Sequence, residues 1–160
     1  MPEAVAERKI PGTGDLVCRV ITPERMVYER RVSAVTLYTL AGTLEVYARH
    51  EPTIAPLAIG VMSIRDADGS EQRIAIHGGF MDMNANTLGI LADAAELEDE
   101  VDRDRASTSL TRAEELLATL TNDDRPGQPV DIDRARLAVA RALLRLRVSG
   151  DNPANPSAKQ

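Results

Sequence analysis

The sequence is poor in aromatic residues. Of its 160 residues only 2 % are aromatic, with no Trp and a single Phe at position 80. A site that stacks nucleic-acid bases on aromatic rings is therefore not expected. The net charge of −6 also leaves no general basic surface to neutralise phosphate backbones. We therefore expect no nucleic-acid partner.

Cysteine and long apolar segments are scarce as well. The single cysteine, Cys18, excludes an internal disulfide and a cysteine-built metal site, and its apolar neighbours predict a small buried side chain on a strand. The longest apolar stretch, 54–64, is broken by Pro56 and Gly60 and falls short of the roughly 20 residues that span a bilayer. Because no signal-peptide pattern is visible, the sequence predicts an intracellular protein.

Motifs of familiar active sites are missing too. The two histidines have no metal-binding spacing, with His50 expected in a turn and His77 at the end of a strand. The sequence also lacks a phosphate-binding P-loop, a GxGxxG motif and a serine nucleophile elbow. We expect no metal and no active site; a small hydrolase that uses one of the histidines is the weakest alternative. The pair Gly78-Gly79 favours a close backbone approach or a bulge.

Residues 15–92 have the pattern of short β-strands. Apolar runs alternate with turn signals such as Ala41-Gly42, 66–69 and 84–86. Many short strands at this spacing are typical of antiparallel sandwiches and flattened barrels. We expect a mainly β chain with added α structure, in which a flexible arm over 1–14 precedes an antiparallel β-sandwich over 15–92.

Residues 93–148 predict an antiparallel hairpin of two helices. In 97–120 an apolar stripe recurs at spacings of three and four, formed by Leu110, Ala113, Leu117 and Leu120. Residues 122–129 break the first helix, and the second should run from about Asp131 to Val148, capped by Asp131 or Asp133. Its stripe consists of Ala135, Ala138, Ala142 and Leu146. Residues 149–160 have the composition of a disordered tail.

Such a hairpin buries little apolar surface by itself. It must therefore lie against the β domain, lie against a partner, or alternate between the two. This inference follows from the pattern alone.

Arginines form a stripe on each predicted helix. The stripes consist of Arg105 and Arg112 on the first helix, and of Arg134, Arg141 and Arg145 on the second. Asp102 lies three residues before Arg105 and can orient it. If the hairpin closes with both stripes inward, the like charges need an anion between them, and a polyphosphate meets that need. The alternative is a pair of solvated faces whose charges pair within each helix.

Four segments, taken in order, resemble the epsilon subunits of bacterial F-type ATP synthases. They are Val20 to Glu29; the spaced positions Gly42, Leu44, Val46, His50, Pro52, Leu57 and Gly60; Gly78-Gly79-Phe80 followed by Asn86 and the stretch Leu91 to Glu96; and the helix end 138–148. The resemblance covers about Leu16 to Val148, and the order and spacing of the segments carry it.

The resemblance implies a non-catalytic rotor subunit of a proton-translocating ATP synthase. In that family the sandwich joins the gamma subunit to the membrane-embedded c-ring and turns with them. The hairpin lies folded on the sandwich, or extends along gamma toward the alpha/beta catalytic hexamer and hinders ATP hydrolysis. The chain would then lie at the cytoplasmic face of the bacterial plasma membrane and meet the membrane only through the c-ring.

Some bacterial members of the family bind ATP on the folded hairpin. Their motif is Ile or Leu followed by Asp-x-x-Arg-Ala, and residues 101–106 fit it with Val at the first position. The resemblance implies ATP-binding residues at Glu96, Asp102, Arg105, Arg112, Arg141 and Arg145, with no metal required for binding. ATP that binds only the folded hairpin would draw the population away from the inhibitory form.

Two positions depart from the family pattern. The family commonly has an acid at the position of Thr43 and a glycine at that of Glu45. The missing acid weakens the expectation of one c-ring contact, and Glu45 indicates a changed loop. The alternative function is a free-standing nucleotide-sensing module, which would bind ATP tightly without any synthase partner.

Overall fold

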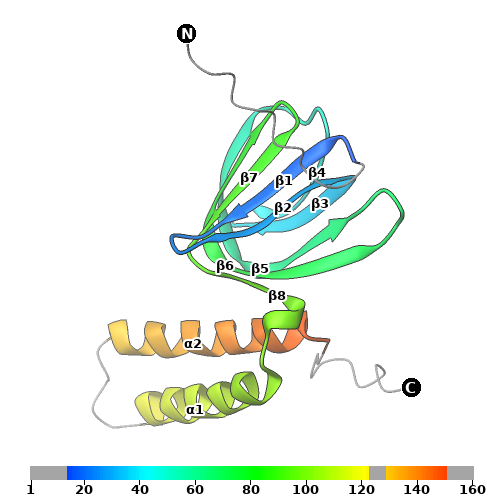
Figure 1. Cartoon of the computed structure of the whole chain (residues 1–160). Coiled ribbons are helices and arrows are strands. Elements are labelled where there is room, and N and C mark those ends of the chain that lie inside the picture. The colour runs from blue at the N-terminus through cyan, green and yellow to red at the C-terminus, as the bar shows by residue number, and fades with distance from the viewer. Residues whose placement is uncertain (1–13, 123–128, 151–160) are drawn as a thin grey trace.

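The computed structural model describes residues 14–122 and 129–150. A folded β-sheet forms one body, and two helices lie side by side against one end of it (Figure 1). The fold class predicted from the sequence is thus confirmed. Three predicted segments lie wholly or mostly outside the described residues. They are the arm 1–14 except for its last residue, most of the break 122–129, and the tail beyond Gly150.

The described sheet has eight strands. They are β1 (Leu16–Ile21), β2 (Met26–Val32), β3 (Ala34–Thr39), β4 (Gly42–Tyr47), β5 (Thr53–Arg65), β6 (Glu71–Asn84), β7 (Thr87–Ala92) and β8 (Ala95–Leu97). The hydrogen-bonded order is β2-β1-β7-β6-β5-β3-β4, and β8 pairs with β6. The long strands β5 and β6 curve beneath the others and close the sheet into a sandwich (Figure 1).

One strand pair departs from the antiparallel prediction. β1 and β7 pair in parallel, from Val17 with Thr87 to Ile21 with Leu91, whereas the other described pairs are antiparallel. Parallel neighbours need a long connection, and here β2 to β6 supply it. The pairing therefore follows from closure of the whole sheet, which no local turn signal predicts.

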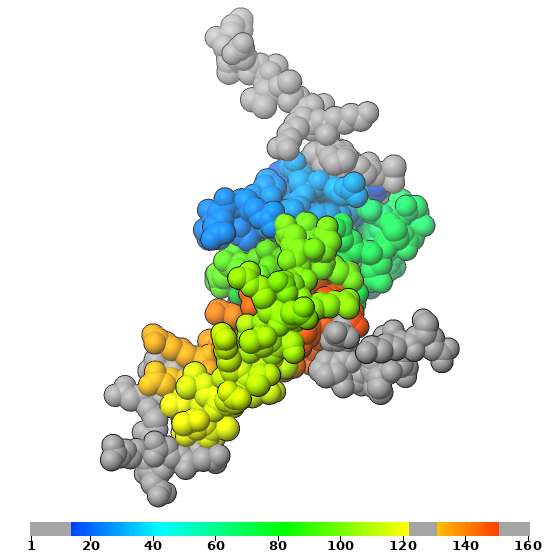
Figure 2. All heavy atoms as spheres, turned by 60° about the horizontal axis from the view of Figure 1, so that its bottom comes forward, coloured from blue at the N-terminus to red at the C-terminus, as the bar shows by residue number. Residues whose placement is uncertain are grey.

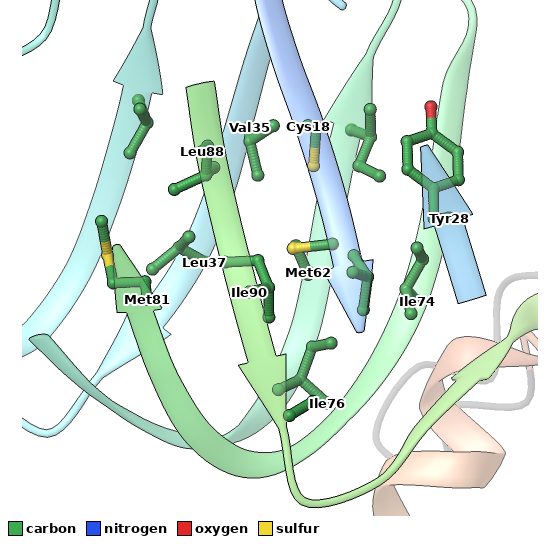
Figure 3. Close-up of a cluster of buried hydrophobic side chains, with 14 of the residues drawn as sticks. Cys18, Tyr28, Val35, Leu37, Met62, Ile74, Ile76, Met81, Leu88 and Ile90 are labelled. Atoms are coloured by element: carbon green, nitrogen blue, oxygen red, sulfur yellow. The ribbon is translucent and has the colours of Figure 1, made fainter. Parts of the chain in front are cut away.

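The core lies between the two layers. Inward side chains of β1 and β7, among them Cys18, Leu88 and Ile90, meet Leu37 and Met62 from the opposite layer (Figure 3). Cys18 is fully buried, as predicted, and burial raises the pKa of its thiol to about 12. A thiol in such surroundings stays protonated and inert, so Cys18 has a packing role.

β6 changes its neighbour at Gly78 and Gly79. Before them it pairs with β8, and from Gly79 onward it pairs with β7. The two glycines have φ of +91° and +118°, and a Cβ on Gly79 would lie 2.1 Å from the carbonyl oxygen of Leu91. The predicted close backbone approach is confirmed. His77 was expected at a strand end, but it lies within β6 because the glycines carry the strand through this change.

β8 extends the sheet beyond the predicted boundary at Ala92. It pairs with β6 from Ile76 opposite Ala95 to Ile74 opposite Leu97, and a 3₁₀ turn, η1 (Glu98–Glu100), then leads to the helices. A strand of three residues is too short to produce a periodic sequence signal. The linker between the sandwich and the hairpin is therefore short, since it consists of η1 and the two residues before α1.

The helices are α1 (Arg103–Asn122) and α2 (Pro129–Val148). The predicted stripe of α1 is buried at Ala113 and half-buried at its three leucines, and α2 buries its stripe at Ala135, Ala142 and Leu146. Ala138 is exposed instead. It lies three residues after Ala135, which rotates it about 60° around the helix axis away from Ala135 and the buried face. Neither helix in the described ranges combines the length and hydropathy needed to cross a membrane.

α2 begins two residues earlier than predicted. Pro129 is its first residue, a position where the missing N–H of proline costs no helical hydrogen bond. Asp131 therefore lies in the first turn, where a carboxylate favours the helix dipole, and does not precede the helix as its cap.

The hairpin contacts the sandwich through α2. Ala75 of β6 is buried with Leu144 and Val148 of α2, and Ile59, Val61 and Val101 pack around them. α1 is the outer helix and faces the viewer in Figure 2. The sandwich core and this small cluster are separate, so the sandwich does not need the hairpin to complete its own core.

Candidate functional site

A groove of about 280 Å³ lies where the hairpin joins the sheet. Its walls come from β8, the linker, the first turns of α1 and the last turns of α2. The lining residues are Glu96, Glu100, Val101, Asp102, Arg105, Ala106, Ser109 and Arg145. The structure thus brings together four of the six predicted site residues: Glu96, Asp102, Arg105 and Arg145.

Glu96 and Arg145 form a two-pronged ion pair across the domain junction. Arg145 donates from Nε to Glu96 Oε2 at 2.7 Å and from Nη2 to Oε1 at 3.1 Å. Each side chain is about one third exposed. Because Glu96 belongs to β8 and Arg145 to α2, we call this pair the junction clasp.

His77 is the second partner of Glu96. Its Nε2 lies 3.3 Å from Glu96 Oε2. This hydrogen bond, followed by Arg145, lowers the pKa of the Glu96 carboxyl to about 2, against the opposing effect of burial. Glu96 therefore remains a carboxylate at neutral pH.

Asp102 acts on the backbone of α1. Its Oδ1 accepts a hydrogen bond from the N–H of Arg105 at 3.0 Å, which is the geometry of a helix N-cap. The predicted orienting contact to the Arg105 side chain is not formed. Within residues 14–122 and 129–150 that guanidinium has no ion-pair partner, so it is free to meet an anion.

The linker is anchored to the sandwich by two further arginines. Arg25, in the turn between β1 and β2, donates to both oxygens of Glu100 at 2.6 and 2.7 Å, and Arg73 of β6 donates to Glu98 at 2.6 Å. These contacts hold Glu98 and Glu100 against the sandwich. Sequence reasoning missed Arg25 and Arg73, because partners 75 and 25 residues apart leave no local pattern.

The arginine stripes do not converge fully. Arg112 lies about two helical turns beyond Arg105, and Arg141 about one turn before Arg145. Both are exposed and outside the lining of the groove. Of the arginines in the two predicted stripes, only Arg105 and Arg145 line the groove, because the groove lies at the first turns of α1 and the last turns of α2.

The groove suits an anionic ligand better than a metal ion. Its carboxylates already have partners: Glu96 binds Arg145, Glu100 binds Arg25, and Asp102 caps α1. Among the described residues, the groove's cation without an ion-pair partner is Arg105. No group of three His, Cys, Asp or Glu side chains in the described part of the chain is placed to hold a metal ion.

The architecture defines a class of protein: a β-sandwich followed by a long helical pair, with a charged groove at the junction. The sequence matches the family model of the beta-sandwich domain of the ATP synthase Delta/Epsilon chain over residues 15–98. It matches the model of the long alpha-helix domain of the same chain over residues 99–150.

Curated relatives agree with these matches. ATP synthase epsilon chains from Bacillus pumilus, Moorella thermoacetica and Lacticaseibacillus casei are 40 %, 37 % and 35 % identical over 131 residues. The alignments cover 81–82 % of this chain and 90–94 % of the relatives. This chain belongs to the ATP synthase epsilon family.

Solved structures share the fold. A chain of the Euglena gracilis mitochondrial ATP synthase, in a structure of OSCP, F1 and c-ring, superposes with a TM-score of 0.67 at 20 % identity, covering 94 % of this chain and 86 % of that one. A chain of the Tetrahymena thermophila central stalk and c-ring superposes at 0.57 with 14 % identity, covering 86 % and 98 %.

The lowered pKa of Glu96 predicts how docking depends on acid. Arg145 supplies the part of this depression that depends on docking, whereas the His77 hydrogen bond lies within the sandwich. The ionised form of Glu96 therefore favours the docked state, and that contribution is lost as the pH falls toward about 2. Energy transfer between dyes on the β5–β6 turn and the outer face of α1 should report increasing undocking over this range. Because Cys18 is buried, dyes on introduced surface cysteines leave it unlabelled.

Glu96→Gln is the control for this titration. It removes the titrating group, so its acid response should lack the step found in the wild type as the pH falls toward about 2. Superimposable pH curves for the two proteins would show that Glu96 does not link docking to pH.

Proposed function

We propose that this chain is a rotor component of a bacterial proton-translocating ATP synthase, in which the sandwich links the gamma subunit to the c-ring. Family membership over both domains is the observation that supports this most strongly. The structure neighbours come from F1/c-ring and central-stalk assemblies. In this role the chain carries no catalytic residue, lies at the cytoplasmic face of the plasma membrane, and meets the membrane only through the c-ring.

An apolar row on the outer face of the sandwich supports a protein partner there. The register places Pro56, Phe80, Leu91, Ile21 and Met26 opposite one another across β5, β6, β7, β1 and β2. Phe80 is 57 % exposed and Leu91 55 %. Exposed apolar side chains that line up in this way mark interaction surfaces. We assign this row to the gamma subunit.

The β3–β4 turn is the proposed c-ring contact. Leu40 is 73 % exposed at its tip, and Gly42 follows with φ +131°. Thr43 is exposed as well, so it provides a hydroxyl where the family pattern has an acid. Glu45 does not replace that acid, because it binds Arg65 at 2.9 Å.

We further propose that the hairpin regulates ATP hydrolysis by leaving the sandwich. Docking buries Leu144 and Val148, and full burial of such side chains is worth about 1.5–3 kcal/mol each. Moving a two-state equilibrium from 99:1 to 1:99 takes about 5.5 kcal/mol. The two quantities are of the same order, so ligands and partners can reverse docking. The extended hairpin would then lie along gamma and reach the alpha/beta hexamer.

ATP is the ligand we propose for the groove. Arg105 has no ion-pair partner among residues 14–122 and 129–150, and Arg145 lies across the groove on α2. Arginine is well suited to phosphate because its planar guanidinium donates two parallel hydrogen bonds. Arg112 and Arg141 would join the site only if the helices shift along each other when ATP binds. ATP bound here would hold α1, α2 and β8 together and favour the docked form.

Assembly with partner subunits is the direct test of the rotor role. Purified chain should join a complex of alpha, beta and gamma subunits, and Phe80→Ser should weaken binding by about 2 kcal/mol, or roughly 30-fold, because an aromatic anchor is lost. Leu40→Ser is the matched control, since it removes an exposed apolar side chain at the c-ring turn.

Failure of the wild-type chain to join the complex would overturn the rotor role. Tight ATP binding together with that failure would favour the alternative, a free-standing nucleotide sensor. Equal losses in the Phe80 and Leu40 variants would refute the assignment of the apolar row to gamma.

Calorimetry with ATP tests the groove. Arg105→Ala should weaken binding by about 1.5–3 kcal/mol, since a hydrogen bond to a charged group is lost. Arg136→Ala is the control, because Arg136 is exposed on α2 and pairs only loosely with Asp133 at 3.6 Å in the described structure. Equal ATP affinity in the wild type and the Arg105 variant would rule out the groove as the site.

A further inference from the structure

A histidine is buried beneath the junction clasp. His77 is 3 % exposed, and its Nε2 lies 3.3 Å from Glu96 Oε2, the oxygen that Arg145 Nε also approaches at 2.7 Å. Among the described residues nothing pairs with its other ring nitrogen, Nδ1, which is buried as well. A buried polar atom without a partner costs stability, so packing alone does not account for a histidine here.

The strand register explains why His77 reaches Glu96. Glu96 of β8 is paired with Ala75 of β6, and His77 lies two residues farther along β6, on the same face. That face looks toward the hairpin, since Ala75 is buried with Leu144 of α2, whereas Ile74 and Ile76 point into the sandwich core. His77 is therefore the diagonal neighbour of Glu96, within reach across the pair.

Glu96 needs such a support. It lies on a strand of three residues at the edge of the sheet, and its side chain is about one third exposed. A carboxylate only accepts hydrogen bonds, so Nε2 of His77 carries the hydrogen and donates it. The donor fixes one carboxylate oxygen from the sheet side, which leaves the carboxylate plane turned toward Arg145.

We propose that His77 is a positioning residue for hairpin docking: it orients Glu96 so that the carboxylate receives both prongs of Arg145. The inference rests on the proposed docking of the hairpin, and not on ATP binding or on assembly with gamma. The lowered pKa of Glu96, for which the His77 hydrogen bond is the foremost cause, supports it. Loss of the donor frees Glu96 to turn to solvent and weakens the clasp without touching the helices.

Two amide variants separate the hydrogen bond from packing. His77→Gln places an N–H donor close to the position of Nε2, whereas the shorter side chain of His77→Asn places it near Nδ1, out of reach of Glu96. Both variants stay polar and fit the space of the ring. Using dye-labelled full-length chain without partners or nucleotide, His77→Asn should raise the undocked fraction at least fivefold, and His77→Gln should stay within twofold of the wild type.

The carboxyl carbon signal of Glu96 in NMR provides a second readout. Its titration should move toward the ordinary range of a glutamate in His77→Asn and stay low in His77→Gln. In Glu96→Gln, adding His77→Asn should cause no further undocking, because the histidine acts through Glu96.

Equal undocking in the Asn and Gln variants would assign His77 to packing and overturn the proposal. So would an Asn variant with wild-type docking and an unchanged Glu96 titration, or additive losses in the double variant. Each of these results can occur whether or not the chain binds ATP or joins the synthase, so failure of the rotor role would be recognised separately.

Discussion

The ion pair between Glu96 and Arg145 connects two parts of the chain that otherwise share a small apolar cluster and a few polar contacts. An isolated pair with this exposure contributes little stability, typically 0–1 kcal/mol. Its importance lies in geometry, because two parallel hydrogen bonds and the support of His77 admit one orientation of α2. The sandwich has its own core, so a weak and directional contact at the junction suits the reversible hairpin that we propose.

The same residues place the proposed nucleotide site at the junction of the sandwich and the hairpin. Arg145 and Glu96 line the groove and form the clasp, while Arg105 faces them from the first turns of α1. The sandwich anchors Glu98 and Glu100, so the proposed release of the hairpin would begin beyond them, at Val101. In the proposed mechanism a ligand in the groove would contact parts that separate on release of the hairpin, which would link binding to docking.

Local sequence patterns predicted much of this fold because its helices and most strands follow regular periods. The stripe of α1 and the buried Cys18 follow from spacing alone. The parallel pairing of β1 with β7 and the strand β8 depend on closure of the whole sheet, which a local pattern does not contain. At the site, helical spacing identified Asp102, Arg105 and Arg145 and the family resemblance added Glu96, whereas His77, Arg25 and Arg73 act across distant strands.

The clasp is tested most directly by a double-mutant cycle on hairpin docking, with Glu96→Gln, Arg145→Gln and the combined variant measured at neutral pH. If the two side chains hold the hairpin together, the combined loss will fall short of the sum of the single losses by more than about 0.5 kcal/mol. Losses that add within that margin would show that the pair does not hold α2 to the sandwich and would contradict the role assigned to the junction clasp.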